Sequence, residues 1–363
     1  MTNRTIKVLV ADDSAVTRML LVHLLESDPQ IVVLGAVEDG QAAVEFMQTE
    51  KPDVVLMDIH MPRLDGFEAT RVIMETQPVP IVICTATTDP AAVATTFRSM
   101  EAGAVACLAK PVSREHADFE ALSQNLLQTI RLMSEVKVVR RWPRLRSVPA
   151  PTSRTTTPQL RSPSPGPRVR LIGIGASTGG PPVLQSILAS LPKDFTVPLL
   201  IVQHIAQGFL PGLVEWLNQT TGLHVHVAVH GMLPLPGHAY LAPDDFHLGV
   251  NTASVMILSR QAQENGVRPA VSYLFRSLAQ NCGAAAVGVL LTGMGKDGAA
   301  ELKLMRDTGA ETIAQDQASS VVHGMPGEAI ALGGANRVLP ADRIADGLLA
   351  VVNSRAAARG LRL

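Results

Sequence analysis

The chain has 363 residues, of which 47% are hydrophobic and 17% charged, and its formal net charge is −1. This length suffices for two domains with one core each, and the composition excludes a disordered or fibrous protein. The balanced charge argues against nucleic acid as a partner. No apolar run approaches the roughly 18 residues of a membrane span. We also expect no signal peptide before the first predicted strand.

The first third of the chain alternates short apolar runs with helical patterns, which predicts βαβ units and a parallel, doubly wound sheet. The expected strands are residues 6–11, 54–57, 81–84 and 104–109, and the expected helices are 14–25, 41–48, 67–76 and 114–137. We place the boundaries of this first domain at residues 5–138.

Four of these strands end in residues suited to phosphoryl chemistry, namely Asp12-Asp13, Asp58, Thr85 and Lys110. The carboxyl ends of parallel strands gather at one edge of a sheet, where ligands bind. Asp58 is the expected phosphoryl acceptor, and Asp12, Asp13 and Asp58 are the expected Mg²⁺ ligands. Lys110 would pair with a phosphoryl oxygen and Thr85 would donate its hydroxyl. The alternative is that these are ordinary turn residues, but the full set at four strand ends favours a phosphate receiver.

A linker is predicted over residues 139–168. Residues 138–168 contain seven arginines, seven prolines and no acidic residue, so helix cannot continue there. The arginines either keep the segment solvated, the interpretation we favour, or dock on an acidic surface.

A second α/β domain is predicted over residues 169–355, again doubly wound and mainly parallel. Strands are expected at 169–175, 197–202, 224–229 and 285–291, and helices at 210–219 and 299–308. Glycines and prolines between residues 230 and 260 separate short strand pieces at 238–241 and 254–258, which suggests a small antiparallel excursion.

A glycine-rich turn, residues 173–180, follows the first strand of this second domain. A dinucleotide-binding loop fits poorly, because the glycine spacing differs and no acidic residue ends the next strand. A purely structural turn is a second interpretation. The third is a nucleophile elbow, since Gly175-x-Ser177-x-Gly179 matches the pattern in which small neighbours allow a strained turn that exposes a serine.

Two further strand ends supply the partners that a serine nucleophile needs. His204 ends the next strand, and Asp297 lies in a glycine-rich loop after a third. Taken singly, His204 is typical of a hydrogen-bonded core histidine and Asp297 of a helix cap. Together with the elbow they predict Ser177 as nucleophile, His204 as general base and Asp297 as the carboxylate that orients it.

Other polar residues are weaker candidates. His224 and His226 alternate with valines, as on the wet face of a half-buried strand, so a metal site with His230 is not favoured. Weaker candidates for a substrate cleft are His238, Tyr240, Asp244, Asp245 and Arg268.

Residues 5–138 resemble the response-regulator receiver family, especially in the stretch MDIHMPRLDG at 57–66. The resemblance implies a flavodoxin-like fold and phosphorylation of Asp58 by a histidine kinase. Three residues before the lysine, the family usually has an aromatic residue that moves on activation, and here that position is Cys107.

Residues 169–353 resemble the catalytic domain of the chemotaxis protein-glutamate methylesterases. The similarity is carried by GASTGG at 175–180, QH at 203–204, PGHAYLAP at 236–243, LTGMGKDG at 291–298 and GMP at 324–326. It implies hydrolysis of glutamyl methyl esters on the cytoplasmic helices of chemoreceptors, deamidation of receptor glutamines, and the chemotaxis histidine kinase as phosphodonor. It also implies that Thr178 and Met294 belong to the oxyanion or substrate loops.

Two other functions compete with this expectation. In the first, the second domain is catalytically degenerate and the chain is a phosphate sink or binding module, but the intact triad argues against it. A DNA-binding regulator would need a basic recognition helix, and outside the linker the chain is acidic. Three widely spaced cysteines indicate a reducing compartment, so we expect a cytoplasmic protein. Ester hydrolysis by a Ser-His-Asp triad is expected to need no cofactor.

Overall fold

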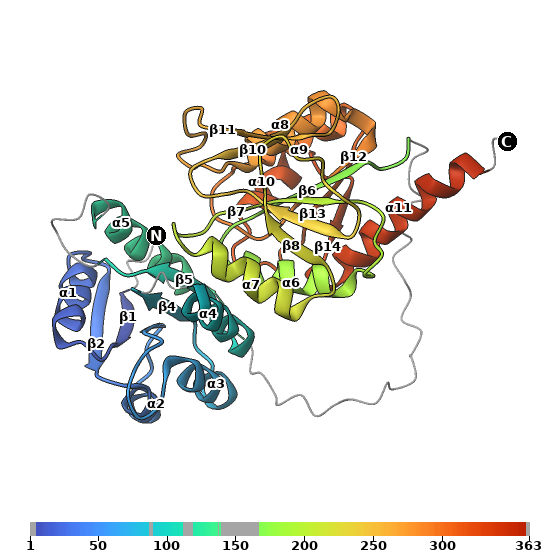
Figure 1. The fold of residues 1–363 in the computed structure, drawn as a ribbon. Coiled ribbons are helices and arrows are strands. Elements are labelled where there is room, and N and C mark those ends of the chain that lie inside the picture. The colour runs from blue at the N-terminus through green and yellow to red at the C-terminus, as the bar shows by residue number, and fades with distance from the viewer. Residues whose placement is uncertain (1–4, 87–89, 112–118, 137, 139–166, 361–363) are drawn as a thin grey trace.

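The computed structural model describes residues 5–86, 90–111, 119–136, 138 and 167–360. Within them the chain forms two α/β halves that lie side by side (Figure 1). Almost all of the predicted linker, residues 139–166, lies outside the described residues. None of the helices in the described part of the chain combines the length and the apolarity that a bilayer crossing requires.

The first half is a parallel sheet in the order β2-β1-β3-β4-β5. Its elements are β1 (Ile6–Ala11), α1 (Ala15–Glu26), β2 (Ile31–Val37), α2 (Gly40–Thr49), β3 (Val54–Met57), α3 (Gly66–Thr76), β4 (Ile81–Thr85), α4 (Pro90–Ala102), β5 (Ala106–Ala109) and α5 (Phe119–Met133). The strand order reverses between β1 and β3, which is where ligands bind in such sheets. The expected doubly wound, flavodoxin-like fold is therefore confirmed.

Short polar side chains begin three helices of this half immediately after the loops at the sheet edge. Ser14 caps α1, Asp39 caps α2 and Asp65 caps α3, each accepting a hydrogen bond from the backbone N–H three residues on. Such caps satisfy amides that the helix cannot pair itself. Since β1 ends at Ala11 and Ser14 caps α1, Asp12 and Asp13 lie in the short loop between them.

The second half is a seven-stranded sheet in the order β14-β13-β12-β6-β7-β9-β8, with every pairing parallel. Its strands are β6 (Leu171–Ala176), β7 (Leu199–Gln203), β8 (His224–Val227), β9 (His238–Leu241), β12 (Ala286–Leu290), β13 (Glu311–Gln315) and β14 (Arg337–Leu339). Its helices are α6 (Gly180–Ser190), α7 (Leu210–Thr220), α8 (Val271–Asn281), α9 (Ala299–Asp307), α10 (Met325–Ala331) and α11 (Ile344–Gly360), with short 3₁₀ turns at Gly283–Ala285 and Ala341–Arg343.

The antiparallel excursion is present but smaller than expected. Strands β10 (His247–Val250) and β11 (Met256–Ser259) form an antiparallel pair. The piece at 238–241, which we expected to belong to this excursion, is instead β9 and lies parallel between β7 and β8. The main sheet accepts it because Ala239 and Leu241 are fully buried against the core.

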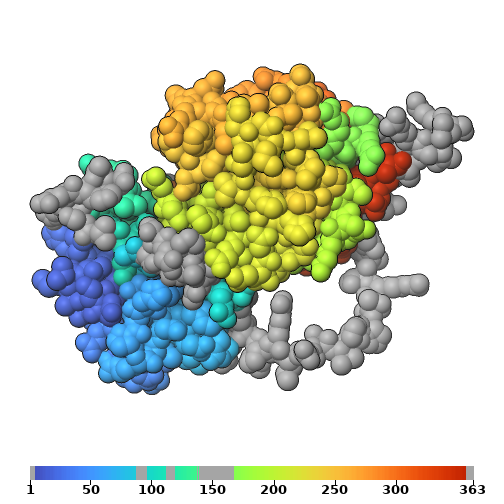
Figure 2. Space-filling model, viewed as in Figure 1, coloured from blue at the N-terminus to red at the C-terminus, as the bar shows by residue number. Residues whose placement is uncertain are grey.

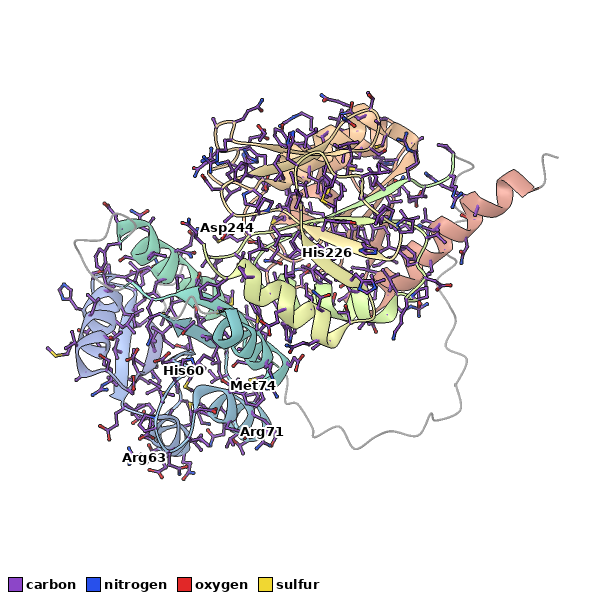
Figure 3. The ribbon with its side chains drawn as sticks, viewed as in Figure 1. His60, Arg63, Arg71, Met74, His226 and Asp244 are labelled. Carbon is purple, nitrogen blue, oxygen red and sulfur yellow. The ribbon has the colours of Figure 1, made fainter. Side chains whose placement is uncertain are left out.

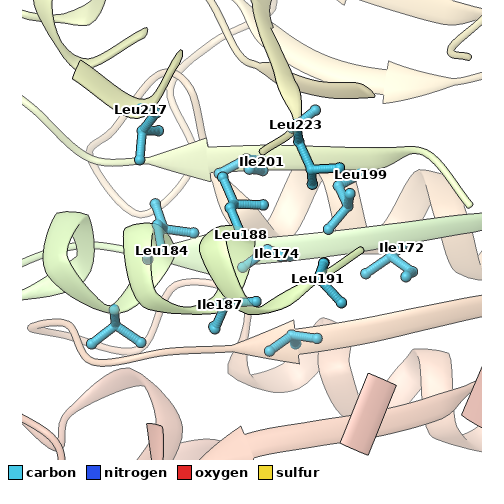
Figure 4. Packing of buried hydrophobic residues seen from close by; sticks show 14 of the residues in the cluster. Ile172, Ile174, Leu184, Ile187, Leu188, Leu191, Leu199, Ile201, Leu217 and Leu223 are labelled. Atoms are coloured by element: carbon cyan, nitrogen blue, oxygen red, sulfur yellow. The ribbon is translucent and has the colours of Figure 1, made fainter. Parts of the chain in front are cut away.

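The core of the second half lies between the sheet and the helices that cover it. Figure 4 shows Ile172 and Ile174 of β6, and Leu199 and Ile201 of β7, packed with the leucines and isoleucine of α6. These strands are buried on both faces, which explains their continuous apolar runs in the sequence. Their rigidity fixes the position of the residues that follow them.

The two halves meet along α4 and α7 (Figure 1). In the space-filling view, the blue and teal first half lies against the yellow-green second half (Figure 2). The Phe97 and Trp216 rings lie 5.7 Å apart and nearly parallel, and the Trp216 indole N–H donates to Glu101 Oε1 over 3.0 Å. Phe97 and Met100 of α4 are buried within the same apolar cluster as the core of the second half. The contact is therefore an apolar interface rather than a loose encounter.

Candidate active site

Ser177 and His204 follow adjacent strands, β6 and β7, at the carboxyl edge of the second sheet. Ala176 and Gln203 are paired in register, and the His204 N–H donates to the Ala176 carbonyl over 2.9 Å. The strand on the other side of β6 is β12, and the loop after it carries Asp297. The predicted convergence of three strand ends is thus present, at the point where the strand order of this sheet reverses.

Asp297 is buried, with 4% of its surface exposed, and each of its oxygens accepts two hydrogen bonds. Its Oδ2 lies 3.0 Å from His204 Nε2 and 2.6 Å from the Val271 amide nitrogen. Its Oδ1 accepts from the Ser272 amide over 3.1 Å and from Asn265 Nδ2 over 2.9 Å. Two of these donors are the first amides of α8, which a helix leaves free at its N-terminus.

The environment of Asp297 favours its charged form. Burial alone would raise the pKa of this carboxyl, but the hydrogen bond and charge of His204, with hydrogen bonds from Ser272 and Val271, lower it to about 2. The carboxylate therefore stays ionised at every physiological pH, as the orienting member of a triad requires.

Ser177 lies in the turn between β6 and α6 and is half-buried. Its amide donates to Thr292 O over 3.0 Å. The strained backbone expected at a nucleophile elbow does not fall on the serine; the left-handed residue of the turn is Gly179, with φ 76°. Among the described residues, no hydrogen bond joins the Ser177 hydroxyl to His204.

The loop after β12 lies against the serine. A Cβ on Gly293 would come within 2.7 Å of Ser177 Cβ, so only glycine permits this approach. The Thr178 carbonyl accepts from the Thr292 hydroxyl over 3.0 Å. Within the described part of the chain, the backbone N–H groups of Thr178 and Met294 donate to no acceptor. Two free donors therefore flank the serine.

A cavity of about 1050 Å³ opens between the two halves of the molecule. Ser177, Thr178, His204, Met294 and Asp297 line it from the second half, and the opposite wall comes from β4, α4, β5 and α5. Because Thr85 and Lys110 also line it, the same cavity extends to the carboxyl edge of the first sheet.

The weaker candidates for a substrate cleft lie outside this cavity. Arg268 pairs with Asp245, and the Asp244 carboxylate caps the Gly208 amide over 2.9 Å (Figure 3). His238 and Tyr240 lie on β9 beside the histidines of β8.

The exposed histidines of β8 form a small ring cluster. His224 and His226 are exposed, as expected for the wet face of a strand, and His226 Nε2 lies 2.8 Å from His238 Nδ1. His230 is not part of this cluster; its Nδ1 instead accepts from the Leu258 amide over 3.1 Å.

The residues predicted for phosphate chemistry converge at the carboxyl edge of the first sheet. Lys110 Nζ lies 2.7 Å from Asp12 Oδ2 and 2.6 Å from Asp58 Oδ2. Asp12, Asp13 and Asp58 each offer a carboxylate oxygen within 4.8 Å of the others. Three carboxylates face one ammonium, and hard oxygen donors of this kind fit a Mg²⁺ ion. Thr85 is buried next to them, and its carbonyl accepts from the Lys110 amide over 3.0 Å.

Burial shapes the charges of this acidic cluster. It raises the pKa of Asp58, with help from the neighbouring Asp12 charge, and outweighs the opposite effect of Lys110. Burial would lower the pKa of Lys110, but its contacts with Asp12 and Asp58 raise it. Lys110 therefore remains a cation. The ionised form of Asp58 is disfavoured, and a further positive charge nearby would stabilise it.

Comparison with known proteins identifies a family for each half of the chain. The family model of the response regulator receiver domain matches residues 8–118, and that of CheB methylesterase matches residues 172–348. A protein-glutamate methylesterase/protein-glutamine glutaminase of Nitrosospira multiformis is 50% identical over 350 residues, covering 96% of this chain and 98% of the relative. A relative from Geobacter metallireducens with the same activity name is 53% identical over 345 residues, covering 94% of this chain and 98% of the relative.

The chain belongs to the CheB methylesterase family. It is a hydrolase with a response regulator receiver domain at its N-terminus, and a catalytically degenerate binding module is not favoured. Within this CheB protein, Cys107 stands where receivers usually carry an aromatic switch residue. It is partly buried and lines the cavity between the halves, and burial raises the pKa of its thiol.

The sequence did not reveal the residues that hold Ser177, His204 and Asp297 in place. Gln203 is almost fully buried, and its Nε2 donates to the carbonyls of Ser177 and His204, both over 2.8 Å. Asn265 and the first turn of α8 hold Asp297. The one available signal was Asn265-Gly266, a dipeptide typical of tight hairpin turns.

Proposed function

We propose that this chain hydrolyses glutamyl methyl esters on the cytoplasmic helices of chemoreceptors, releasing methanol, and deamidates receptor glutamines. The observation that carries the proposal is the buried His204–Asp297 pair beside Ser177 in one cavity. It is supported by relatives whose names state both activities and which match nearly the whole chain.

The acylation step follows from the orientation of His204. Because Nε2 faces Asp297, Nδ1 is the nitrogen left to take the proton of Ser177 Oγ. The serine oxygen then bonds to the ester carbonyl carbon, and the carbonyl oxygen becomes an oxyanion. The free N–H groups of Thr178 and Met294 are the proposed donors to it.

Collapse of this tetrahedral species breaks the bond to the methoxy oxygen, which leaves as methanol with the proton from His204. Water then attacks the acyl-serine ester with His204 again as base, giving a glutamate carboxylate and free Ser177. A glutamine side chain follows the same course with ammonia as the leaving group.

Asp58 is the proposed site of phosphorylation by the chemotaxis histidine kinase. Its carboxylate attacks the phosphorus atom of the kinase's phosphohistidine and forms an acyl phosphate, while the P–N bond breaks and the kinase imidazole leaves. Asp12, Asp13 and Asp58 are the proposed holders of Mg²⁺, which neutralises charge on the transferring oxygens when bound. Lys110 and Thr85 would then contact the phosphoryl group, so Lys110 would have to release its present carboxylate partners.

Phosphorylation is proposed to control access to Ser177. The receiver covers one wall of the catalytic cavity, which leaves no room for a bundle of receptor helices. Movement of Thr85 and Lys110 would loosen the adjoining α4–α7 interface. The proposed units are a receiver at 5–138, a linker at 139–168 and a catalytic domain at 169–355, in a protein of the cytoplasm.

Methanol release from methylated receptor, with and without acetyl phosphate, tests the proposal. We expect release by the purified chain, stimulation by acetyl phosphate, and loss of that stimulation with basal turnover intact in Asp58→Asn. The exposed Asp194→Asn is a matched control that should respond like the wild type. Absence of methanol, together with failure of a fluorophosphonate to label Ser177, would instead indicate a binding module.

A further inference from the structure

A two-residue turn outside the triad reaches into the active site. Glu264 and Val267 pair through both of their backbone hydrogen bonds, of 3.0 and 3.1 Å, and enclose Asn265 and Gly266. Both enclosed residues have positive φ, 53° and 79°, which is the geometry of a tight hairpin turn of this length. Asparagine and glycine tolerate that backbone, so the turn forms without strain.

The turn aims the Asn265 amide at the catalytic carboxylate. Asn265 Nδ2 donates to Asp297 Oδ1 over 2.9 Å and to Ser272 Oγ over 3.1 Å, which uses both of its N–H bonds. Ser272 Oγ in turn accepts from the Gly298 amide over 3.0 Å and donates to Glu301 over 2.7 Å. The amide N–H groups of Asn265 are thus tied into a network with Ser272, Asp297 and Glu301.

The turn itself is anchored to α8. Glu264 forms an ion pair with Arg276, and Arg276 lies 3.8 Å from Glu301. The same helix supplies the Val271 and Ser272 amides to Asp297. The turn and the helix N-terminus therefore hold the carboxylate as one rigid unit.

The hydrogen bond from Asn265 fixes the orientation of the Asp297 carboxylate. Oδ2 has the short Val271 contact of 2.6 Å as well as His204, whereas Oδ1 has Asn265 and the longer Ser272 amide contact of 3.1 Å. Asn265 also lines the cavity, so it covers the side from which water would approach Oδ1. Without it, the carboxylate could rotate toward solvent and loosen its hold on His204.

We infer that Asn265 is a positioning residue of the triad, which fixes the Asp297 carboxylate so that Oδ2 orients His204. It does not touch the substrate in this account. The inference rests on the proposed function, because it assumes that Ser177, His204 and Asp297 act together.

Two variants test it without disturbing the turn. Asn265→Gly removes the amide but keeps the positive φ, and Asn265→Asp keeps the shape but replaces the donor by a second carboxylate. Asn251→Ala, which removes a turn-stabilising side chain outside the cavity, is the matched control. The readout is the rate of Ser177 labelling by a fluorophosphonate across a pH series, with thermal unfolding followed in parallel.

We expect Asn265→Gly to slow labelling by about 10- to 100-fold, because a small misplacement of a catalytic group costs about that much. In Asn265→Asp, the acid limb of the pH–rate profile should move to higher pH, because the added negative charge favours the protonated imidazole. Asn251→Ala should label like the wild type. Labelling rates within twofold of wild type and an unmoved pH profile in both Asn265 variants would overturn the inference.

The two proposals can fail separately. If wild-type Ser177 is labelled rapidly but no methanol leaves methylated receptor, the substrate assignment fails, and the Asn265 comparison still decides the positioning role. If wild-type Ser177 is not labelled at all, no activated serine exists and the positioning role fails with it.

Discussion

Two buried aspartates, one in each half of the molecule, show how the surroundings set the chemistry of the same side chain. Asp58 and Asp297 follow parallel strands and are 6% and 4% exposed. Burial acts on both in the same direction, yet the pKa of Asp58 is raised and that of Asp297 is lowered to about 2. Burial therefore does not distinguish the two sites.

The difference lies in the neighbours. Asp297 has no acidic neighbour among its contacts and accepts from His204, Asn265 and two amides at a helix N-terminus. Asp58 shares the Lys110 ammonium with the Asp12 carboxylate. Fixed donors keep Asp297 permanently charged, whereas the crowded carboxylates at Asp58 favour the binding of a cation.

The largest expected effect comes from removing Ser177, the proposed nucleophile. Ser177→Ala should lower methanol release on the order of 10⁴–10⁶-fold, because the triad acts as a unit and loses its attacking oxygen. Ser190→Ala, an exposed serine at the end of α6, should leave the rate unchanged. Retention of more than about one hundredth of wild-type turnover would mean that another group attacks the ester.

The next largest effect should distinguish the two aspartates by stability. The folded-state pKa of Asp297 is about 2, below the ordinary aspartate value of 3.8. Its ionisation therefore stabilises the fold above pH 3.8, by about 2 kcal/mol, and this contribution is lost as the pH falls through about 2. Asp297→Asn should lower the free energy of unfolding at pH 7.

Asp58→Asn should instead raise the free energy of unfolding at pH 7. The raised pKa of Asp58 means that its ionised form is disfavoured in the folded state, so stability declines as the pH rises from 3.8 through the folded-state pKa. A neutral amide removes that cost at pH 7. Urea unfolding of both variants in the presence of a chelator checks the comparison, and shifts of the same sign would contradict it.

How far the sequence predicts these sites depends on whether the residues follow strands. The positions of Ser177, His204 and Asp58 could be predicted, because strand periodicity locates strand ends and parallel strand ends share an edge. Asn265 was not, because it reaches Asp297 across 32 positions from a hairpin turn whose docking depends on α8. The pattern of small residues predicted a strained turn at the serine but not that Gly179 would supply its left-handed conformation.

The sequence likewise does not show which elements pack against each other. The piece at 238–241 shows alternation but no sign of its neighbours, and burial of Ala239 and Leu241 places it in the parallel sheet. The α4–α7 interface depends on which face of each helix meets the other. Helical periodicity reveals an apolar face but not its partner.

The smallest expected effect tests whether the two sites communicate through that interface. Phe97 is 1% exposed and stacks on Trp216, so Phe97→Ala leaves a void between α4 and α7. If the receiver blocks the cavity, basal methanol release should rise by up to about tenfold, the effect of roughly 1.4 kcal/mol of weaker docking. Stimulation by acetyl phosphate should shrink by the same factor, because both the substitution and phosphorylation release the same contact.

The control is Met19→Ala, at a side chain on α1 that is 74% exposed, and it should change neither rate. Constant basal turnover in Phe97→Ala would mean that the halves act independently, and a fall would contradict the blocking of the cavity by the receiver.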